Sequence, residues 1–580
     1  MMNRFLNLDK MAFSSYGSSM TITRKQNAYM GFDFSHTVPD GYYFHPLYDA
    51  EMFYGLIFKL AFEGIDSIDI QYEFLPEVLH LFYDLNSLRL CFVDPRTIRF
   101  SGHVERGFIL EYENPRRGDV AFKIDDRHVE LNAYSKKAML HVHQGTVEID
   151  APWSCQNARC QYIRIRLLPD NNGSLDFSFE EFDRGWFASG ENADFESCID
   201  KQREAFLSFK TRGIQCDDPY YAEALEACAY MAWSCVFQNN GYIGNHEIIV
   251  LSKNWMAMTA SWDNTFDLLP YAGTDQKLAF DQIFGIFDYQ EPTGALPDWI
   301  TTQRFNHSFL KPPVIGAVMN VLLDDGIEFE EAYLRELCPR LERLVSFWLH
   351  YRDYDHDGIP EYGHGNDSGC DNCTVFDLAP NIEAPDLTAY IIADYDFLAR
   401  CEERFGNDER AQMWRKHADT LYDKLIEHSW CKARGQFVSP ISGNHQLADG
   451  DALINYMPIL LGKRLSPEIR GCLVRGLRKN NRFYTRWGFA SESVSSAQYD
   501  RDSYWRGPIW APQMFFVVEG LRQCGEAEFA AEAARRYVNL CMHAGCFAEN
   551  YDALNGIGLR DTSYSWASNV FQYFVKKYCC

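Results

Sequence analysis

The stretch YYAEALEACAYMAWSCVF, residues 220–237, marks the point at which the hydrophobic period of the sequence changes. Its apolar residues recur at helical spacing, at Leu225, Cys228, Ala229, Ala232, Trp233, Val236 and Phe237. This spacing predicts a helix with one wide apolar face. The same period predicts further helices near residues 264–290, 312–324, 328–351, 385–404, 407–428, 450–462, 466–479, 507–523, 526–543 and 562–577.

These predicted helices are joined by loops of very unequal length. The pattern favours a mainly α fold, an (α/α)6 barrel in which six helix pairs form a ring and long polar loops gather over one open end. An irregular helical domain or a helical solenoid is the alternative. The sequence shows no self-similarity with a period of about 34 or 40 residues, which argues against a solenoid.

Upstream of this change, from Ser67 to Asp183, short runs alternate apolar and polar residues between turn residues. The runs are SIDIQYEF, LRLCFV, TIRFSGHV, FILEYE, VAFKID, HVELNAY, MLHVHQGTVEI, CQYIRIRLL and SLDFSFEEF, and MTITRK and AYMGFDFS could add strands. A period of two with β-branched and aromatic enrichment predicts an antiparallel β-sandwich. We therefore expect a β-rich sandwich domain at 1–190, a linker at 191–214 and the barrel as catalytic domain at 215–580.

Composition limits the partners of the chain. Its 580 residues carry a formal net charge of −26, which repels nucleic acid and anionic lipid. The N-terminus lacks the apolar core of a secretory signal, and no window reaches the apolar length of a membrane span, so we expect a cytoplasmic protein.

Most of the 18 cysteines are isolated and are interpreted as small buried hydrophobes. The single CxxC, Cys370 and Cys373, has no second pair to complete a zinc site.

Five long loops share a composition rich in Trp, Tyr, Asp, Glu, His and Gly. They span residues 253–266, 294–313, 352–377, 488–512 and 547–558. Connections of this length are more often functional than not, and we expect these loops to line one site. An aromatic content of 15% is consistent with a sugar-binding cleft lined by rings.

The third loop, RDYDHDGIPEYGHGNDSGCDN at 352–372, resembles a calcium loop at its start. Asp353, Asp355, Asp357 and Gly358 match the first positions of an EF-hand, but His364 stands where a bidentate carboxylate is required. Calcium at the three aspartates is thus one hypothesis. The other is that they cap and turn the chain after a helix. Apart from this calcium ion, no cofactor is expected to be required.

Glycosidic hydrolysis needs two carboxyl groups, one protonated and one ionised, on opposite sides of the scissile bond. A carboxyl stays protonated at neutral pH in a water-poor aromatic pocket or beside a second carboxylate. The loops offer such candidates at Asp263, Asp298, Asp367, Asp371, Glu492, Asp502, Glu549 and Asp552.

Several ordered motifs carry a resemblance. The run NDSGCDNCTVFD (366–377) is similar to the SGxDNSP-type segment of clan G glycoside hydrolases, especially glycoside hydrolase family 63. LPDWI, LKPPVIG, SYWRGPIW, AENYDALNG and SYSWAS follow the order found in that family, whose members include glucosidases and mannosylglycerate or glucosylglycerate hydrolases. The resemblance covers roughly 215–580 and implies an (α/α)6 barrel, often preceded by a β-rich domain.

Position by position, the resemblance makes Asp371 the general acid and Glu549 the general base of an inverting reaction. It implies that the pocket is lined by Trp262, Asp263, Trp299, Lys311, Tyr504, Trp505, Arg506, Trp510, Tyr551 and Trp566, to which His364 is added as a candidate sugar ligand. Asp367 is the rival for the acid. Cys373 and Thr374 replace the usual Ser-Pro pair, which leaves the leaving-group specificity open.

The predicted function is therefore hydrolysis of an α-glycosidic bond, with an α-glucoside in a small oligosaccharide or glycoside as the expected substrate. A sugar epimerase on the same barrel, or a non-catalytic carbohydrate-binding protein, is the alternative. Asp371 could instead be a helix-capping or turn residue, and Trp505 and Trp510 could be core residues. The sequence specifies neither the glycone, the linkage nor the oligomeric state.

Overall fold

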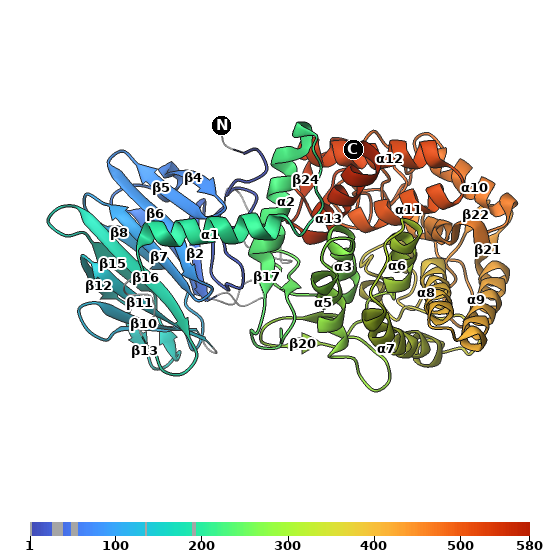
Figure 1. Ribbon diagram of the computed structural model, residues 1–580, viewed down its shortest axis with the longest axis horizontal. Coiled ribbons are helices and arrows are strands. Elements are labelled where there is room, and N and C mark those ends of the chain that lie inside the picture. The colour runs from blue at the N-terminus through green and yellow to red at the C-terminus, as the bar shows by residue number, and fades with distance from the viewer. Residues whose placement is uncertain (1–2, 26–38, 48–55, 134–135, 188–192) are drawn as a thin grey trace. The chain divides into compact units, whose positions relative to one another are not determined.

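The computed structural model describes residues 3–25, 39–47, 56–133, 136–187 and 193–580. The chain forms two compact units (Figure 1). Unit 1 consists of Met1–Arg212, Glu223–Asn240 and Ser252–Met258, and unit 2 of Gly213–Ala222, Gly241–Leu251 and Thr259–Cys580. The units thus interleave in sequence, whereas the prediction placed one linker, residues 191–214, between two continuous domains. The predicted strand AYMGFDFS lies outside the described residues.

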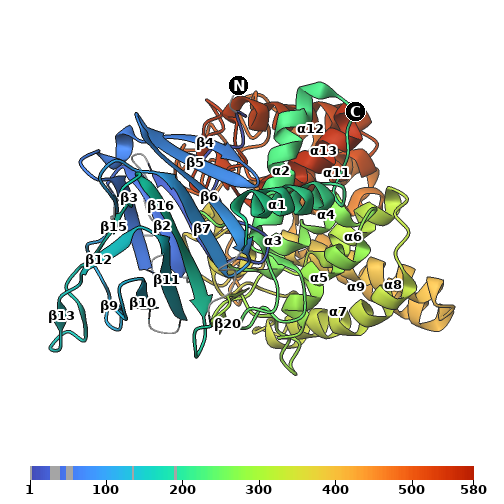
Figure 2. The same cartoon turned by 60° about the vertical axis from the view of Figure 1, so that its left-hand side comes forward.

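Unit 1 contains two antiparallel sheets. The first has the order β1 (Thr21–Lys25), β2 (Gly41–Leu47), β3 (Leu56–Phe62), β8 (Phe108–Tyr112), β15 (Ile163–Leu168) and β12 (Thr146–Asp150). The second has the order β4 (Gln71–Leu75), β5 (Val78–Tyr83), β6 (Asn86–Asp94), β7 (Thr97–His103), β16 (Ser174–Phe182), β11 (Lys136–Gln144), β10 (His128–Ala133) and β9 (Val120–Lys123). The predicted sandwich of short strands is confirmed (Figure 2).

Phenylalanines fill the space between the two sheets. The ring of Phe44 on β2 lies 4.7 Å from that of Phe179 on β16, and Phe108 on β8 lies 6.2 Å from Phe177 on β16. Phe100 on β7 stacks on Phe177 at 4.6 Å. These rings occupy alternate positions of their strands, so the period of two in the sequence corresponds to this core.

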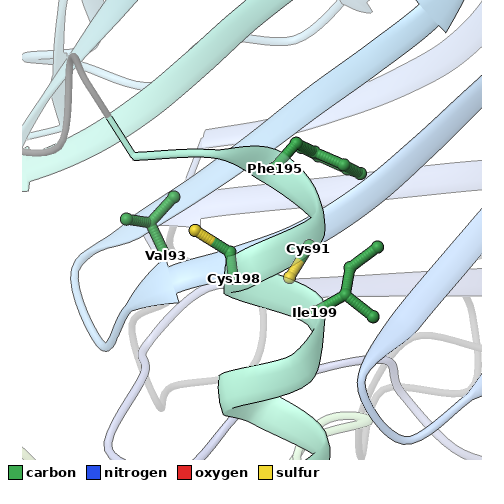
Figure 3. Close-up of a cluster of buried hydrophobic side chains, with 5 residues drawn as sticks. All are labelled: Cys91, Val93, Phe195, Cys198 and Ile199. Atoms are coloured by element: carbon green, nitrogen blue, oxygen red, sulfur yellow. The ribbon is translucent and has the colours of Figure 1, made fainter.

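Helix α1 (Phe195–Lys210) occupies most of the segment that was predicted as a linker. Its first turn is capped by Asp194, whose side chain accepts a hydrogen bond from the Ser197 amide at 2.9 Å. One face of α1 packs on β6 through Phe195, Cys198 and Ile199 on the helix and Cys91 and Val93 on the strand (Figure 3). Because α1 covers the outer face of β6, that strand is buried on both sides at residues 90–93.

Unit 2 is built of helices in two layers. Successive helices of the inner layer contact one another in the order α6 (Ile315–Asp324), α8 (Pro385–Arg404), η5 (a 3-10 helix, Leu453–Arg464), α11 (Ala511–Gln523) and α13 (Ser565–Phe574). Helix α13 also contacts α4 (Leu268–Tyr271). The others are α3 (Ser261–Thr265), α5 (Gln276–Phe287), α7 (Glu331–Tyr351), α9 (Asp408–Ser429), α10 (Pro467–Arg478) and α12 (Ala527–Ala544).

The burial of the helices distinguishes the two layers. α8, α11 and α13 are buried on nearly all sides, as expected of the inner ring. α9, α10 and α12 bury one face and pack outside α8, η5 and α11, respectively. The predicted (α/α)6 barrel is therefore confirmed (Figure 1).

Three predicted helices differ in detail. The helix at 220–237 is α2 (Ala222–Cys235), followed by the short strand β17 (Val236–Phe237). The predicted helix 264–290 is broken into α3, α4 and α5, and Asp275 caps α5 by accepting from the Leu278 amide at 3.0 Å. The predicted helix 450–462 corresponds to η5 (Leu453–Arg464), a 3-10 segment that contains Pro458 and is kinked at Gly462, which has φ +52°.

One pair of cysteines forms a disulfide, Cys216–Cys580, within unit 2. This departs from the expectation of isolated cysteines for these two residues. The other sixteen form no disulfide, including Cys370 and Cys373 of the CxxC sequence. Among the helices of the described ranges, none combines the length and apolarity needed to cross a membrane.

Candidate active site

Asp371 lies in a tight loop between two 3-10 turns, η3 (Gly365–Ser368) and η4 (Thr374–Phe376). Two glycines make the loop possible. A Cβ on Gly365 would lie 1.9 Å from the carbonyl oxygen of Asp371. Gly369 has φ +69°, and a Cβ there would lie 3.2 Å from the ring of Trp262. The glycine-rich sequence is thus needed to place the backbone of Asp371.

The residue after Asp371 fastens this loop to the SYWRG segment. Asn372 donates from Nδ2 to the carbonyl oxygen of Ser503 at 3.1 Å and accepts at Oδ1 from the amide of Trp505 at 2.9 Å. Nε of Arg506 donates to the carbonyl oxygen of Asn372 at 2.9 Å. Tyr504, between these contacts, has φ +57°, an uncommon conformation that the surrounding hydrogen bonds maintain.

Glu549 is fixed by three hydrogen bonds and is 1% exposed. Its amide donates to the carbonyl oxygen of Asp561 at 2.7 Å, and Nε1 of Trp566 donates to its carbonyl oxygen at 3.1 Å. The hydroxyl of Tyr504 donates to Oε1 at 2.7 Å. Oε2 is buried and has no hydrogen-bond partner within the described residues. One carboxylate oxygen is thus oriented by the protein, and the other remains available for a ligand.

The electrostatics of this region connect the two carboxyls. Burial raises the pKa of Glu549 to about 8, although the hydrogen bond from Tyr504 lowers it. Burial likewise raises the pKa of Asp371 to about 6, where Lys311 opposes the shift. The pKa of Tyr504 is raised well above 10, first by burial and then by the charges of Glu549, Asp371 and Asp263. Tyr504 is therefore within electrostatic reach of both predicted catalytic residues.

A half-buried lysine and three carboxylates form the polar side of the site. Nζ of Lys311 lies 3.1 Å from Oδ1 of Asp298 and donates to the carbonyl oxygen of Asn366 at 2.9 Å. Burial alone would lower the pKa of Lys311, but Asp298, Asp371 and Asp263 raise it. A charged lysine at this point balances part of the negative charge of the site.

Asp263, which is 4% exposed, is a further carboxyl of this group. The hydroxyl of Tyr564 donates to its Oδ1 at 2.9 Å, and burial raises its pKa to about 7. Tyr564 also has a raised pKa, caused by burial and by the charges of Asp263 and Glu549. The two tyrosines therefore join Asp263, Asp371 and Glu549 into one electrostatic group.

The predicted tryptophans are mostly packing partners. Trp505 and Trp510 stack at 3.7 Å with both rings buried, and Trp510 contacts Trp566 edge-on at 5.7 Å. Trp262 is also buried, packs against Phe266, Tyr390 and Phe516, and supports Gly369 from one side. Trp299 is half-buried, and Cζ of Arg304 lies 5.7 Å from the centre of its ring.

Other predicted ligands have identified partners. The Tyr551 hydroxyl donates to the carbonyl oxygen of Cys546 at 3.1 Å and accepts from the Ala548 amide at 2.9 Å. Arg506 forms an ion pair with Asp377. His364 is exposed and lies 4.9 Å from the ring of Phe309.

Asp367, the rival for the general acid, is fully occupied by structural contacts. It accepts from the amides of Leu310 at 2.8 Å and Gly363 at 3.0 Å. Glu492, Asp502 and Asp552 are likewise engaged, with Thr374, Arg560 and Arg501. These four carboxyls are thus held by other parts of the protein.

Sequence analysis did not single out Tyr564, Asn366 or Asn372. Tyr564 lies in the quoted motif SYSWAS, two residues before Trp566, and the strand-like alternation there would have placed both on the same side. Asn372 is the asparagine of the quoted SGxDN-type segment, whereas Asn366 has no signal beyond its position beside Asp367.

The calcium hypothesis stays a prediction. Carboxylate oxygens of Asp353, Asp355 and Asp357 lie within 4.8 Å of one another, a spacing that a single cation could bridge. Within the cluster each aspartate also accepts a backbone amide of the same turn, as the alternative interpretation expects.

The (α/α)6 barrel with carboxyls on its loops agrees with the architecture that the resemblance to glycoside hydrolases implied, and the family match assigns the class. Residues 256–567 match the family of the mannosylglycerate hydrolase MGH1-like glycoside hydrolase domain. This match spans more than half of the chain, and the chain belongs to that family. The resemblance to glycoside hydrolase family 63 is thereby confirmed.

Curated relatives agree with this assignment. The chain is 37% identical over 434 residues to mannosylglycerate hydrolase MGH2 of Selaginella moellendorffii, covering 60% of this chain and 84% of the relative. It is 23% identical over 397 residues to mannosylglycerate hydrolase of Thermus thermophilus, covering 54% and 93%.

Solved structures share the fold. A family 63 mannosylglycerate hydrolase from Thermus thermophilus, in complex with Tris, superposes with a TM-score of 0.51 at 19% identity, covering 57% of this chain and 96% of that one. A bacterial glucoamylase complexed with acarbose gives a TM-score of 0.63 at 9% identity, covering 99% and 94%. At these identities the likeness concerns the fold alone.

Proposed function

We propose that the chain hydrolyses an α-glycoside with inversion, with Asp371 as general acid and Glu549 as general base. The observation that carries the proposal is the state of Glu549. Oε1 is held by the hydroxyl of Tyr504 at 2.7 Å, whereas the buried Oε2 has no partner within the described residues and shares its electrostatic surroundings with Asp371. A general base needs such an oriented oxygen with one available lone pair.

The proposed reaction proceeds in one displacement. Oε2 of Glu549 takes a proton from a water molecule as the water oxygen bonds to the anomeric carbon. The bond from that carbon to the glycosidic oxygen breaks, and Asp371 transfers its proton to the leaving oxygen. The products are a sugar of inverted configuration and a free alcohol, and the two carboxyls exchange their protonation states.

The pKa values of the ligand-free protein favour a second assignment. Burial raises the pKa of Glu549 to about 8 and that of Asp371 only to about 6, so Glu549 would hold its proton more firmly. On this basis Glu549 would be the acid and Asp371 the base. We prefer the first assignment because the family motif places the acid at Asp371, and because the hydrogen bond from the Tyr504 hydroxyl orients Oε1 of Glu549 and leaves Oε2 for a water molecule.

The substrate we propose is an α-glycoside of a small hydroxy acid such as glycerate. Four curated relatives are named mannosylglycerate hydrolases, and a fifth, from Schizosaccharomyces pombe, a probable mannosyl-oligosaccharide glucosidase. Mannose is therefore the first glycone to test, with the expected glucose beside it. Asp263, Lys311 and Asp298 are polar groups suited to sugar hydroxyls.

The experiment is a comparison of mannosylglycerate, glucosylglycerate and α-linked disaccharides, with proton NMR of the first-formed sugar. The proposal expects release of the β anomer from the preferred α-glycoside. An initial α anomer would exclude inversion. No release from any of these substrates by folded protein would instead favour a carbohydrate-binding role.

A further inference from the structure

A second cluster of ionisable side chains lies in unit 2, formed by residues that the proposed reaction does not use. It joins the turn after α7, the residue Glu383 before α8, His428 near the end of α9 and His445 in a later loop. Single ligand atoms of Asp357, Glu383, His428 and His445 all lie within 4.8 Å of one another. Four segments distant in sequence thus bring two imidazoles and two carboxylates together.

The distances between these atoms suit a single small cation. Oδ2 of Asp357 lies 3.6 Å from Nδ1 of His428 and 3.6 Å from Nε2 of His445. Nε2 of His445 lies 3.8 Å from Oε1 of Glu383. Four ligands at about 2.1 Å from a tetrahedral ion would be about 3.4 Å apart. Small side-chain movements would close these distances.

The cluster also contains buried oxygens that lack partners. Glu383 and Glu361 are both 0% exposed. Oε1 of Glu383 and both carboxylate oxygens of Glu361 accept no hydrogen bond within the described part of the chain, although the hydroxyl of Ser442 is near enough to lower the pKa of Glu361. Buried carboxylates without partners are costly unless a cation is close by.

Protein cations supply only part of this compensation. Nζ of Lys424 donates to the main-chain oxygen of Asp357 at 2.8 Å, which leaves the side-chain oxygens of Asp357 to other partners. Nε2 of His428 lies 2.5 Å from Oε2 of Glu383 and supplies a second partner. Oε1 of Glu383 and both carboxylate oxygens of Glu361 still accept no hydrogen bond within the described residues.

His428 has the orientation found in metal sites. Its Nε2 is 2.5 Å from Oε2 of Glu383, while Nδ1 points toward Asp357. A histidine that binds a metal through one nitrogen usually donates from the other to a carboxylate, which fixes the ring and its tautomer. Nε2 of His445, the nitrogen that faces Asp357 and Glu383, lies 3.0 Å from Oδ2 of Asp355, which also accepts from the Gly443 amide at 2.9 Å. On binding the ion, this nitrogen would exchange its contact with Asp355 for the metal.

We propose that Asp357, Glu383, His428 and His445 bind one divalent transition-metal ion of the zinc type. Two imidazole nitrogens favour such an ion over calcium, which prefers six to eight oxygen ligands. The ion would have a structural role. It would fasten the turn at 353–361 to Glu383, and this turn leads directly into the loop that carries Asp371.

The test uses the full chain, stripped with a chelator and then dialysed against Zn²⁺ or Co²⁺. Wild type is expected to retain about one equivalent of Zn²⁺ by elemental analysis and to melt several degrees higher than the stripped protein. Co²⁺ should produce visible d–d bands. His445→Ala and the milder His445→Gln should raise the Zn²⁺ Kd by at least about tenfold and abolish the thermal shift.

His417→Ala is the matched control, because His417 is an exposed residue on the same helix as His428 and lies outside the cluster. It should bind Zn²⁺ as wild type does. Equal melting temperatures of stripped wild type and His445→Gln would show that the variant folds.

Three outcomes would overturn the proposal. One is the absence of Zn²⁺ uptake by wild type. Another is unchanged uptake in both His445 variants, which would place the ion elsewhere. The third is a melting temperature raised by Ca²⁺ but not by Zn²⁺, which would favour the aspartate-only site at Asp353, Asp355 and Asp357.

Discussion

The hydroxyl of Tyr504 donates a 2.7 Å hydrogen bond to Oε1 of Glu549, and the backbone of Tyr504 has φ +57°. The uncommon backbone conformation is maintained by the contacts of Asn372, the residue next to Asp371, with both neighbours of Tyr504. The proposed base is therefore oriented through the same loop contacts that position the proposed acid. This relationship makes Tyr504 a positioning residue whose role can be tested.

Tyr504→Phe should lower kcat by about 10²-fold and raise the pKa of Glu549, because the lost hydrogen bond stabilises the ionised carboxylate. Because the pKa of Glu549 is about 8 and that of Asp371 about 6, the alkaline limb of the kcat/KM profile reports Glu549, and this limb, measured from pH 4 to 10, should move to higher pH. Tyr551→Phe is the control, since its hydroxyl bonds to the 546–548 backbone instead. An unshifted limb in Tyr504→Phe would contradict the role of Tyr504.

Substitutions of Asp371 and Glu549 should show which of the two residues is the general acid and which is the general base. Asp371→Asn should lose at least about 10³-fold on a natural glycoside but retain most activity on an α-glycosyl fluoride, whose leaving group needs no proton. Glu549→Gln should be inactive on both substrates, because water is no longer activated. Initial rates with each substrate provide the measurement. The reverse pattern would establish the assignment that the ligand-free pKa values favour.

Much of the fold was predictable because its signals are local. Alternating residues in unit 1 correspond to the Phe44–Phe179 core, and the helical period corresponds to amphipathic helices such as α12. The failures have physical causes. Helix α1 has apolar residues at helical spacing, Phe195, Cys198 and Ile199, but its other residues are mostly polar, and the segment was predicted as a linker. The helix is stabilised by packing of these three residues on β6, a contact that the sequence does not reveal.

The site was less predictable than the fold. Motif order identified Asp371 and Glu549, but the partners of a buried carboxyl depend on contacts between segments far apart in sequence. Tyr564 reaches Asp263 across 301 positions, and no local pattern encodes that hydrogen bond. For the same reason the sequence pointed only to the three alternate aspartates of one loop as a calcium site. His428 and His445 are distant from that loop in sequence and approach Asp357 only in the folded chain.

The contribution of three carboxyls of the site to the free energy of unfolding should decrease as the pH rises. Burial raises the pKa values of Asp371, Asp263 and Glu549 to about 6, 7 and 8, so the native state binds protons that the unfolded chain releases near pH 4. The stabilising contribution is complete below about pH 4 and is lost as the pH rises through 6 to 8. Glu549→Gln removes the largest of these shifts.

The difference in melting temperature, Glu549→Gln minus wild type, should therefore increase by about 2–5 °C between pH 5.5 and pH 8.5. Differential scanning calorimetry at matched ionic strength gives the comparison. Parallel curves for the two proteins would mean that Glu549 titrates normally and is less enclosed than its burial indicates.

Gly365→Ala should impair catalysis without touching the substrate. The added methyl would meet the carbonyl oxygen of Asp371 at 1.9 Å, so the acid-bearing loop must move. Because productive geometry tolerates little displacement, we expect kcat to fall by at least about tenfold, with a smaller change in KM. Gly244→Ala is the control, since a Cβ there meets no atom within 4 Å and its φ is not positive. If both variants retained wild-type kcat, the position of the Asp371 backbone would not limit the reaction, and the assignment of Asp371 as proton donor would lose its structural basis.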